Sequence, residues 1–167
     1  LMAVLDGSIV TVAMPTIQAD LGFSPAGLSW VMNGYLLAFG GLLLLAGRLG
    51  DLIGRKPMFL AGTAVFVAAS ALAGVADSPT TLVVARILQG VGGAASSGVS
   101  LGILVTLFTD PRERGRALGV FAFTGAAGAS IGQVLGGVLT ESLNWHWNFT
   151  INVPIGVLTL AAAAKAI

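Results

Sequence analysis

Asp6 and Arg86 are the two ionisable side chains that lie inside long apolar stretches of this sequence. A charge at the centre of a membrane helix costs about 2.5–3.5 kcal/mol on insertion scales, so such residues normally face a protein interior or a wet cavity and have a partner. We therefore expect Asp6 and Arg86 to face such an interior or cavity and to have partners there. For Arg86 there is an alternative, because it lies near the end of its apolar stretch and could extend toward the membrane surface.

The composition excludes several classes of protein. Hydrophobic residues make up 56% of the chain and charged residues 9%, whereas a soluble domain has about 25% charged residues. The net charge is +1 and the cations lie in short connections, so a nucleic-acid partner is not expected. No cysteine is present, which excludes disulfides and thiolate metal sites. The sequence is that of an integral membrane protein with the lipid bilayer as its surroundings.

Long runs without charge define the elements that position these residues. Five runs of 20 to 27 residues contain no Asp, Glu, Lys or Arg, and about 20 apolar residues suffice to cross a hydrocarbon core of roughly 30 Å. The sequence therefore predicts an all-α membrane protein, a bundle of six transmembrane helices near residues 1–18, 28–49, 57–76, 81–107, 117–140 and 148–165.

The connections between these helices alternate in charge. Those after the second and fourth helices hold six of the eight Lys and Arg residues, among them Arg48 and Arg112. Those after the first, third and fifth contain Asp20, Asp77 and Glu141 but no cation. The positive-inside rule then predicts a multi-pass protein of the plasma membrane with both ends of this segment in the cytoplasm.

The connection from Gly47 to Pro57 reads GRLGDLIGRKP and is expected to form a tight turn between two membrane helices. It resembles the loop between helices 2 and 3 of the major facilitator superfamily of secondary transporters. Leu52 departs from that pattern, which usually has Lys or Arg there. A simpler interpretation is a loop whose cations only hold it in the cytosol. The residues that carry the resemblance to this gate loop are Gly47, Leu49, Asp51, Gly54, Arg55 and Lys56.

Two further stretches resemble one branch of that superfamily. The segment from Leu5 to Pro15 is similar to the helix-1 motif of the fourteen-helix drug:proton antiporters. The segment from Leu82 to Gly93 is similar to the helix-4 motif that antiporters link to proton coupling. The resemblance implies that Asp6, Arg86 and Gln89 belong to a proton or substrate pathway.

The fifth predicted helix carries a row of glycines. Gly128, Gly132 and Gly136 recur every four residues, with Gly137 beside them, so we expect this face to pack closely against another helix. The pattern resembles the antiporter helix-5 motif, but Gln133 stands where that motif has proline. After this helix, Trp145 and Trp147 suit a membrane interface. We expect no functional role for His146, which replaces the usual arginine between them.

Taken together, the resemblance implies that residues 1–167 are the N-terminal half of a major facilitator transporter, built as 3+3 inverted repeats. The C-terminal half would lie outside this chain and be its partner. A central cavity lined by the first, second, fourth and fifth helices would bind the small-molecule substrate, with Asp6, Asn33, Arg86 and Gln89 as its polar residues.

The implied activity is proton-coupled efflux of drugs or other small amphipathic molecules by alternating access. It needs the proton gradient and neither a cofactor nor a metal. The gate loop would lock against the other half in the outward-facing state. Two alternatives remain open: a metabolite uniporter or symporter of the same superfamily, and a truncated membrane protein that transports nothing.

Two enzyme-like patterns are discounted. The residues from Gly90 to Ala95 fit G-x-G-x-x-A, but no strand precedes them as a dinucleotide site requires. Ser97 with His146 faintly resembles an intramembrane serine protease, yet the glycine two residues before the serine is missing. We therefore do not expect an enzyme.

Overall fold

The computed structural model describes residues 1–167, and all of its regular structure is α-helical. Its helices are long, and short turns connect them. They are α1 (Met2–Leu21), α2 (Pro25–Ile53), α3 (Arg55–Gly74), α4 (Pro79–Leu107), α5 (Pro111–Ser142), α6 (His146–Thr150) and α7 (Asn152–Ala166).

The predicted architecture of six spans is confirmed. Six helices are long and apolar enough to cross a membrane. The sixth consists of α6 and α7, which form one span from His146 to Ala166. Ile151 between them keeps helical dihedral angles (φ −60°, ψ −26°), so the span continues through the junction.

Three helices begin earlier than the predicted starts at residues 28, 81 and 117, and the reason is the same in each. A Ser or Asp side chain accepts hydrogen bonds from the first free N–H groups of the helix. A proline then occupies the first helical position, where its missing N–H costs nothing. The pairs are Ser24–Pro25, Ser78–Pro79 and Asp110–Pro111.

The turn between α2 and α3 is shorter than expected. Helix α2 continues to Ile53 and α3 begins at Arg55, so Gly54 alone connects them. Gly54 has φ +107°, a conformation that a residue with a Cβ rarely adopts. Pro57 is the third residue of α3 and not the first, still within the turn whose N–H groups lack helical partners.

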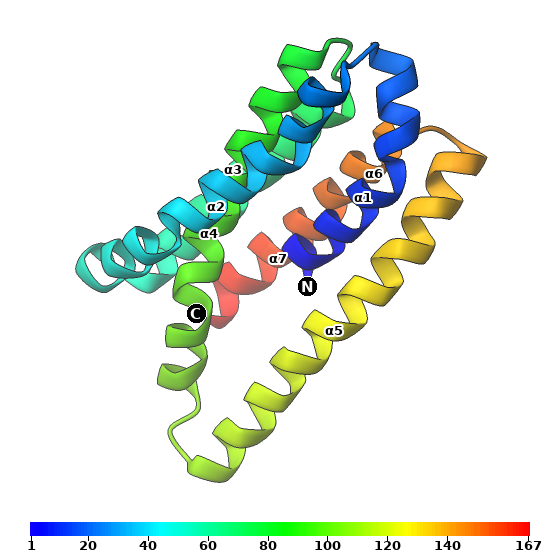
Figure 1. Ribbon diagram of the computed structural model, residues 1–167. Helices are drawn as coiled ribbons and strands as arrows, with labels where there is room; N and C mark the ends of the chain where they lie inside the picture. The colour runs from blue at the N-terminus through cyan, green and yellow to red at the C-terminus, as the bar shows by residue number, and fades with distance from the viewer.

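The helices form two groups on either side of the last span (Figure 1). Helix α5 packs along α1, whereas α2 and α3 both pack against α4, and α3 also contacts α7. We call the end with the Gly54 turn and the turn at 108–110 the basic end, because the helix ends beside these turns carry Arg48, Arg55, Lys56, Arg112, Arg114 and Arg116. The opposite end, which contains Asp20, Asp77 and Glu141, is the acidic end.

The apolar core lies toward the acidic end. It includes side chains from α1, α3, α4 and α6 that are almost completely buried, among them Ile17, Leu82, Trp145 and Phe149. A tightly packed core at this end holds these helices in fixed positions, and a cluster of buried polar side chains lies on α1, α3, α4 and α7.

Candidate functional site

Asp6 on α1 and Arg86 on α4 form an ion pair inside the bundle. Arg86 Nη1 lies 2.5 Å from Asp6 Oδ2, and both side chains are 0% exposed. An isolated buried charge would cost several kcal/mol, whereas a well-aligned pair with further hydrogen bonds offsets much of that cost. The side chain of Arg86 is therefore turned into the bundle and not toward the membrane surface.

Three more side chains complete the buried polar cluster around this pair. Asn152 Nδ2 donates to Asp6 Oδ1 at 2.7 Å, and Gln89 Nε2 donates to the same oxygen at 3.2 Å. Gln89 also accepts from Arg86 Nη1 (2.8 Å) and donates to Ser70 Oγ (2.8 Å). Every contact of Asp6 is donated to its carboxylate, which suits the ionised, acceptor-only form. The buried polar cluster consists of Asp6, Ser70, Arg86, Gln89 and Asn152.

Aromatic rings enclose the guanidinium. The Cζ atom of Arg86 lies 4.3 Å from the centre of the Tyr35 ring and 5.9 Å from that of Phe149. A cation over an aromatic face is attracted by about 0.5–2 kcal/mol, more where water is absent. The rings therefore help to hold Arg86 in place.

Glycines on α4 bring its neighbours close enough to build this site. A Cβ on Gly90 would lie 2.5 Å from the backbone oxygen of Tyr35 on α2, and one on Gly92 would lie 2.5 Å from the backbone nitrogen of Phe66 on α3. Because no side chain separates α2 from α4, the carbonyl of Val31 can accept from Arg86 Nε at 2.9 Å.

Asn33 does not join the cluster. It is exposed on α2, two residues after Val31 and on a different face of the helix. Asp6, Arg86 and Gln89 lie inside the bundle, whereas Asn33 lies on its surface. Asn33 is therefore separate from the buried polar cluster, and its place on the wall of a central cavity stays a prediction.

The gate loop forms a second polar site at the basic end. Arg55 Nη2 lies 3.0 Å from Asp51 Oδ1 across the Gly54 turn, and the two side chains are 39% and 47% exposed. Arg55 Nη1 also donates to the carbonyl of Gly102 (2.8 Å) and to Thr106 Oγ1 (2.7 Å) on α4. Arg55 thus joins the turn to α4.

Lys56 and Gly47 complete the contacts of the gate loop. Lys56 Nζ donates to the carbonyl of Ala164 at 3.0 Å, near the end of α7, where a cation favours the helix dipole. A Cβ on Gly47 would lie 3.4 Å from the carbonyl of Gly98 on α4. The loop is therefore attached to two neighbouring helices.

Comparison with known proteins shows to which family this chain belongs. The family model of the Major Facilitator Superfamily matches residues 1–167. This chain belongs to the major facilitator superfamily. Over 96% of this chain, it is 48% identical to the puromycin resistance protein pur8 of Streptomyces alboniger. Over 99% of this chain, it is 45% identical to the cephamycin export protein CmcT of Amycolatopsis lactamdurans. It is also 38% identical to the multidrug transporter protein MdtP of Bacillus subtilis over 98%.

The chain spans about a third of the length of these curated relatives. The matched share is 32% of pur8, 34% of CmcT and 30% of MdtP. Six apolar spans in a major facilitator chain make it a multi-pass membrane protein of a transporter family and not an enzyme. No group of three or more His, Asp or Glu side chains is placed to hold a metal ion.

In this major facilitator half, the glycine row of α5 faces α1. A Cβ on Gly132 would lie 2.8 Å from the carbonyl of Leu5, and one on Gly136 would lie 3.0 Å from that of Ile9. Gly128 has the same relation to Leu1. A Cβ on Gly137 would meet nothing within 4 Å. Gly137 therefore lies outside the packing face, contrary to the expectation from the sequence.

Sequence reasoning missed several residues of the cluster. Asn152 and Ser70 were not among the candidate residues, nor was Tyr35, which covers the guanidinium. The available signal was an asparagine deep in a charge-free stretch. Trp145 also differs from expectation, since it is 1% exposed in the core while Trp147 is 47% exposed.

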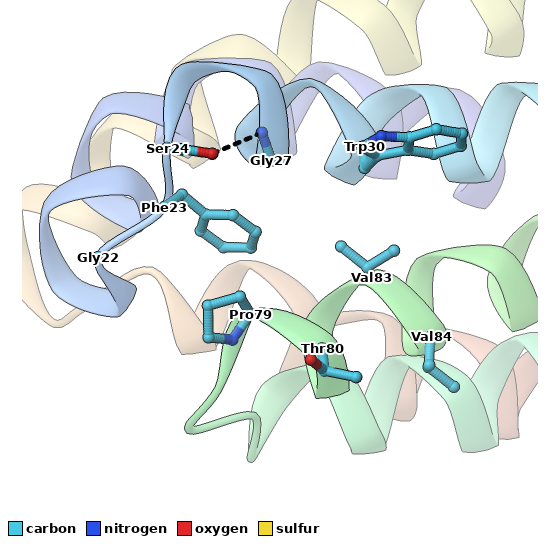
Figure 2. A pocket seen from close by; sticks show the side chains of 9 residues that line it. All are labelled: Gly22, Phe23, Ser24, Gly27, Trp30, Pro79, Thr80, Val83 and Val84. Carbon is cyan, nitrogen blue, oxygen red and sulfur yellow. Dashed lines mark hydrogen bonds between the residues drawn. The ribbon is translucent and has the colours of Figure 1, made fainter.

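A surface pocket of about 510 Å³ opens at the acidic end between the first turns of α2 and α4. Figure 2 shows the Phe23 ring and Pro79 at one side of it and Val83 at the other. No charged residue lines this pocket and none of the buried polar cluster reaches it. It is therefore separate from the site around Asp6.

Proposed function

We propose that the complete protein is a secondary active transporter that exports drugs or other small amphipathic molecules in exchange for protons. Membership of the superfamily supports transport, and relatives named for puromycin resistance and cephamycin export support efflux. The observation that supports coupling to protons is the position of the Asp6 carboxylate. A guanidinium and two amides hold it without contact to solvent.

The proposed coupling follows from the chemistry of this cluster. Protonation of Asp6 would neutralise it and weaken its contacts with Arg86 and Asn152, because each contact is strongest with the ionised form. A proton would therefore change how α1, α4 and α7 are held together. Such a change can favour one of the two states of alternating access, provided that the proton has different affinities for them.

We place the basic end in the cytoplasm of a plasma-membrane protein, with both ends of this segment on that side. The two halves would rock about a central substrate site. The gate loop around Asp51 would lock against the C-terminal half in the outward-facing state. The attachment of Arg55 to α4 supports a rigid loop suited to that contact.

The decisive experiment is Asp6→Asn in the full-length transporter, assayed in inside-out vesicles with an imposed pH gradient. We expect loss of gradient-driven uptake while substrate exchange without a gradient remains. Gln133→Ala is the matched control, because this amide is exposed on α5 and makes no contact with the cluster, so it should not affect coupling. Unchanged gradient-driven uptake by Asp6→Asn would show that another residue carries the coupling proton. Absence of gradient-driven uptake in the wild type would instead favour a uniporter or symporter of metabolites.

A further inference from the structure

The Asp6 carboxylate has no exposed surface even in this six-span half taken alone. If Asp6 carries the coupling proton, as proposed above, that proton must pass between packed helices to reach it. On α4, Arg86 is only about two turns from Pro79 at the acidic end, whereas the helix continues to Leu107. On α1, Asp6 lies about one turn from a hollow of about 330 Å³ that Met2, Ala3 and Thr63 help to line. Water therefore comes near the cluster from both ends, and the polar atoms in between decide the route.

Three buried side-chain atoms of the protein have no hydrogen-bond partner: Arg86 Nη2, Asn152 Oδ1 and Asn148 Oδ1. Arg86 supplies a donor and the two asparagines supply acceptors. A buried polar atom without a partner costs about 1–3 kcal/mol, and water molecules are the usual remedy. Asn148 and Asn152 are four residues apart in the last span, so they share one face at a separation of about 6 Å along the axis.

The row continues from Asn148 to the acidic end. Asn148 Nδ2 donates to Thr140 Oγ1 at 2.8 Å, and Thr140 is only partly buried in the last turn of α5. The next residue, Glu141, is exposed. At the inner end of the row, Asn152 Nδ2 contacts Asp6 Oδ1 at 2.7 Å. The row therefore joins the buried carboxylate to the surface through amide and hydroxyl groups alone.

The other contacts of the cluster do not lead to the surface. Ser70 on α3 is fully buried, and Arg86 Nε ends on the backbone carbonyl of Val31. On α2, the Tyr35 ring covers the guanidinium with its face. Around the buried polar cluster itself, the other charged or titratable side chains in contact are Arg86 and Tyr35. Toward the acidic end the row passes two more titratable groups: Glu141, exposed beside Thr140, and His146, which contacts the carbonyl of Ala76 two residues before Asn148.

We propose that water molecules held by Asn152 and Asn148 carry protons between the acidic-end surface at Thr140 and Asp6. A proton taken from bulk water at Thr140 passes along the hydrogen-bonded waters and ends on the Asp6 carboxylate, which becomes a neutral carboxylic acid. Arg86 keeps its proton throughout. The asparagines stay neutral and only orient the waters, so Asn148 and Asn152 are positioning residues.

The test is Asn148→Leu in the full-length transporter, reconstituted in proteoliposomes that contain a pH-sensitive dye. A pH gradient across the vesicle membrane drives protons from outside to inside. We expect the initial rate of this proton movement to fall about tenfold, which corresponds to an increase of 1.36 kcal/mol in its activation free energy. The pH dependence of substrate binding at equilibrium should stay the same, since Asp6 keeps all of its donors. Asn148→Ser, which retains a hydroxyl and leaves room for water, should restore the rate.

Gln133→Leu is the matched control, because it replaces an amide by leucine on the exposed face of α5 and should leave the rate unchanged. Thr140→Val is a second variant that keeps the shape of a surface residue. It should lower the rate about threefold by removing the outermost contact. It also covers the case in which Asn148→Leu does not fold.

Full rates in both Asn148→Leu and Thr140→Val would overturn the proposed route. A change in both the rate of proton movement and the equilibrium pH dependence of substrate binding in Asn148→Leu would also overturn it, because that is the mark of a purely structural role. Slowing of proton movement by Tyr35→Phe alone would overturn it as well, since it would place the route at α2. These outcomes leave the role of Asp6 intact, since only retained coupling in Asp6→Asn contradicts that role.

Discussion

The chain contains two ion pairs of the same chemistry in opposite surroundings. Asp6 and Arg86 join helices 80 residues apart in sequence and are fully buried, whereas Asp51 and Arg55 lie four residues apart and are nearly half exposed. Coulombic attraction at 4 Å is about 1 kcal/mol in water and several-fold larger near or inside a protein. The buried partners therefore depend strongly on each other, while the exposed pair mainly orients the turn that contains it.

The two pairs also differ in what fixes their geometry. The buried pair depends on where α1 and α4 lie, and glycines of α4 and α5 set those positions. The exposed pair depends on one dihedral angle, the positive φ of Gly54. Packing changes should therefore affect the first pair, and changes of charge or salt the second.

The largest effect is expected for Arg86→Leu. This variant leaves the Asp6 carboxylate buried without its cation, which costs about 3–5 kcal/mol. Denaturant unfolding of the purified full-length protein measures the loss. The double variant Asp6→Asn/Arg86→Leu should recover much of it, because no unpaired charge remains. Equal instability of the single and double variants would show that lost packing, and not charge, is the cause.

Gly132→Leu should come next, because its side chain would collide with Leu5 and Ser8 and push α1 away from α5. Overpacking of this kind costs about 1–3 kcal/mol. Gly137→Leu is the control on the same helix, where a side chain meets open space. Thermal unfolding of the two variants compares them directly, and equal melting temperatures would contradict the assigned packing face.

Asp51→Asn should change stability little, since exposed ion pairs contribute about 0–1 kcal/mol. High salt should reduce even that difference, because it screens exposed charges. Transport by this variant should nevertheless fall, as the proposed gate role requires. Stability measured at low and high salt, together with efflux in cells, tests both statements. Wild-type efflux would refute the gate role.

The smallest effect is expected for Lys56→Met, which removes the cation near the C-terminal end of α7. A favourable charge at a helix end contributes about 0.3–1 kcal/mol. Amide hydrogen exchange in the last turn of α7 should become faster while exchange in α1 stays unchanged. Equal protection in the variant and the wild type would mean that the Lys56 contact does not stabilise that turn.

Hydropathy and charge in the sequence were sufficient to predict the fold. The six spans follow from the length of the charge-free runs, because the bilayer imposes one requirement on every helix. Helix ends were less predictable, since Ser24, Ser78 and Asp110 extend helices into polar sequence that hydropathy assigns to loops. The Ser-Pro and Asp-Pro pairs were readable signals of those starts.

The candidate site was only half predictable. Asp6 and Arg86 stand out because charge is costly in a membrane, and Gln89 lies one turn from Arg86 on the same face. Asn152 and Ser70 could not be assigned, because contacts across helices depend on rotation about each helix axis. Asn33, an equally polar residue in an equally apolar stretch, lies outside for the same reason.

The last span also binds the ends of two other helices at the acidic end. The indole Nε1–H of Trp145 donates to Asp20 Oδ2 at 2.7 Å, beside the end of α1. The Nε2–H of His146 donates to the carbonyl of Ala76 at 3.0 Å, just after α3, and so fixes the tautomer of that ring. Spreading α1 from α3 at this rim would break at least one of these bonds. The start of the last span therefore ties the two helices together at the acidic end.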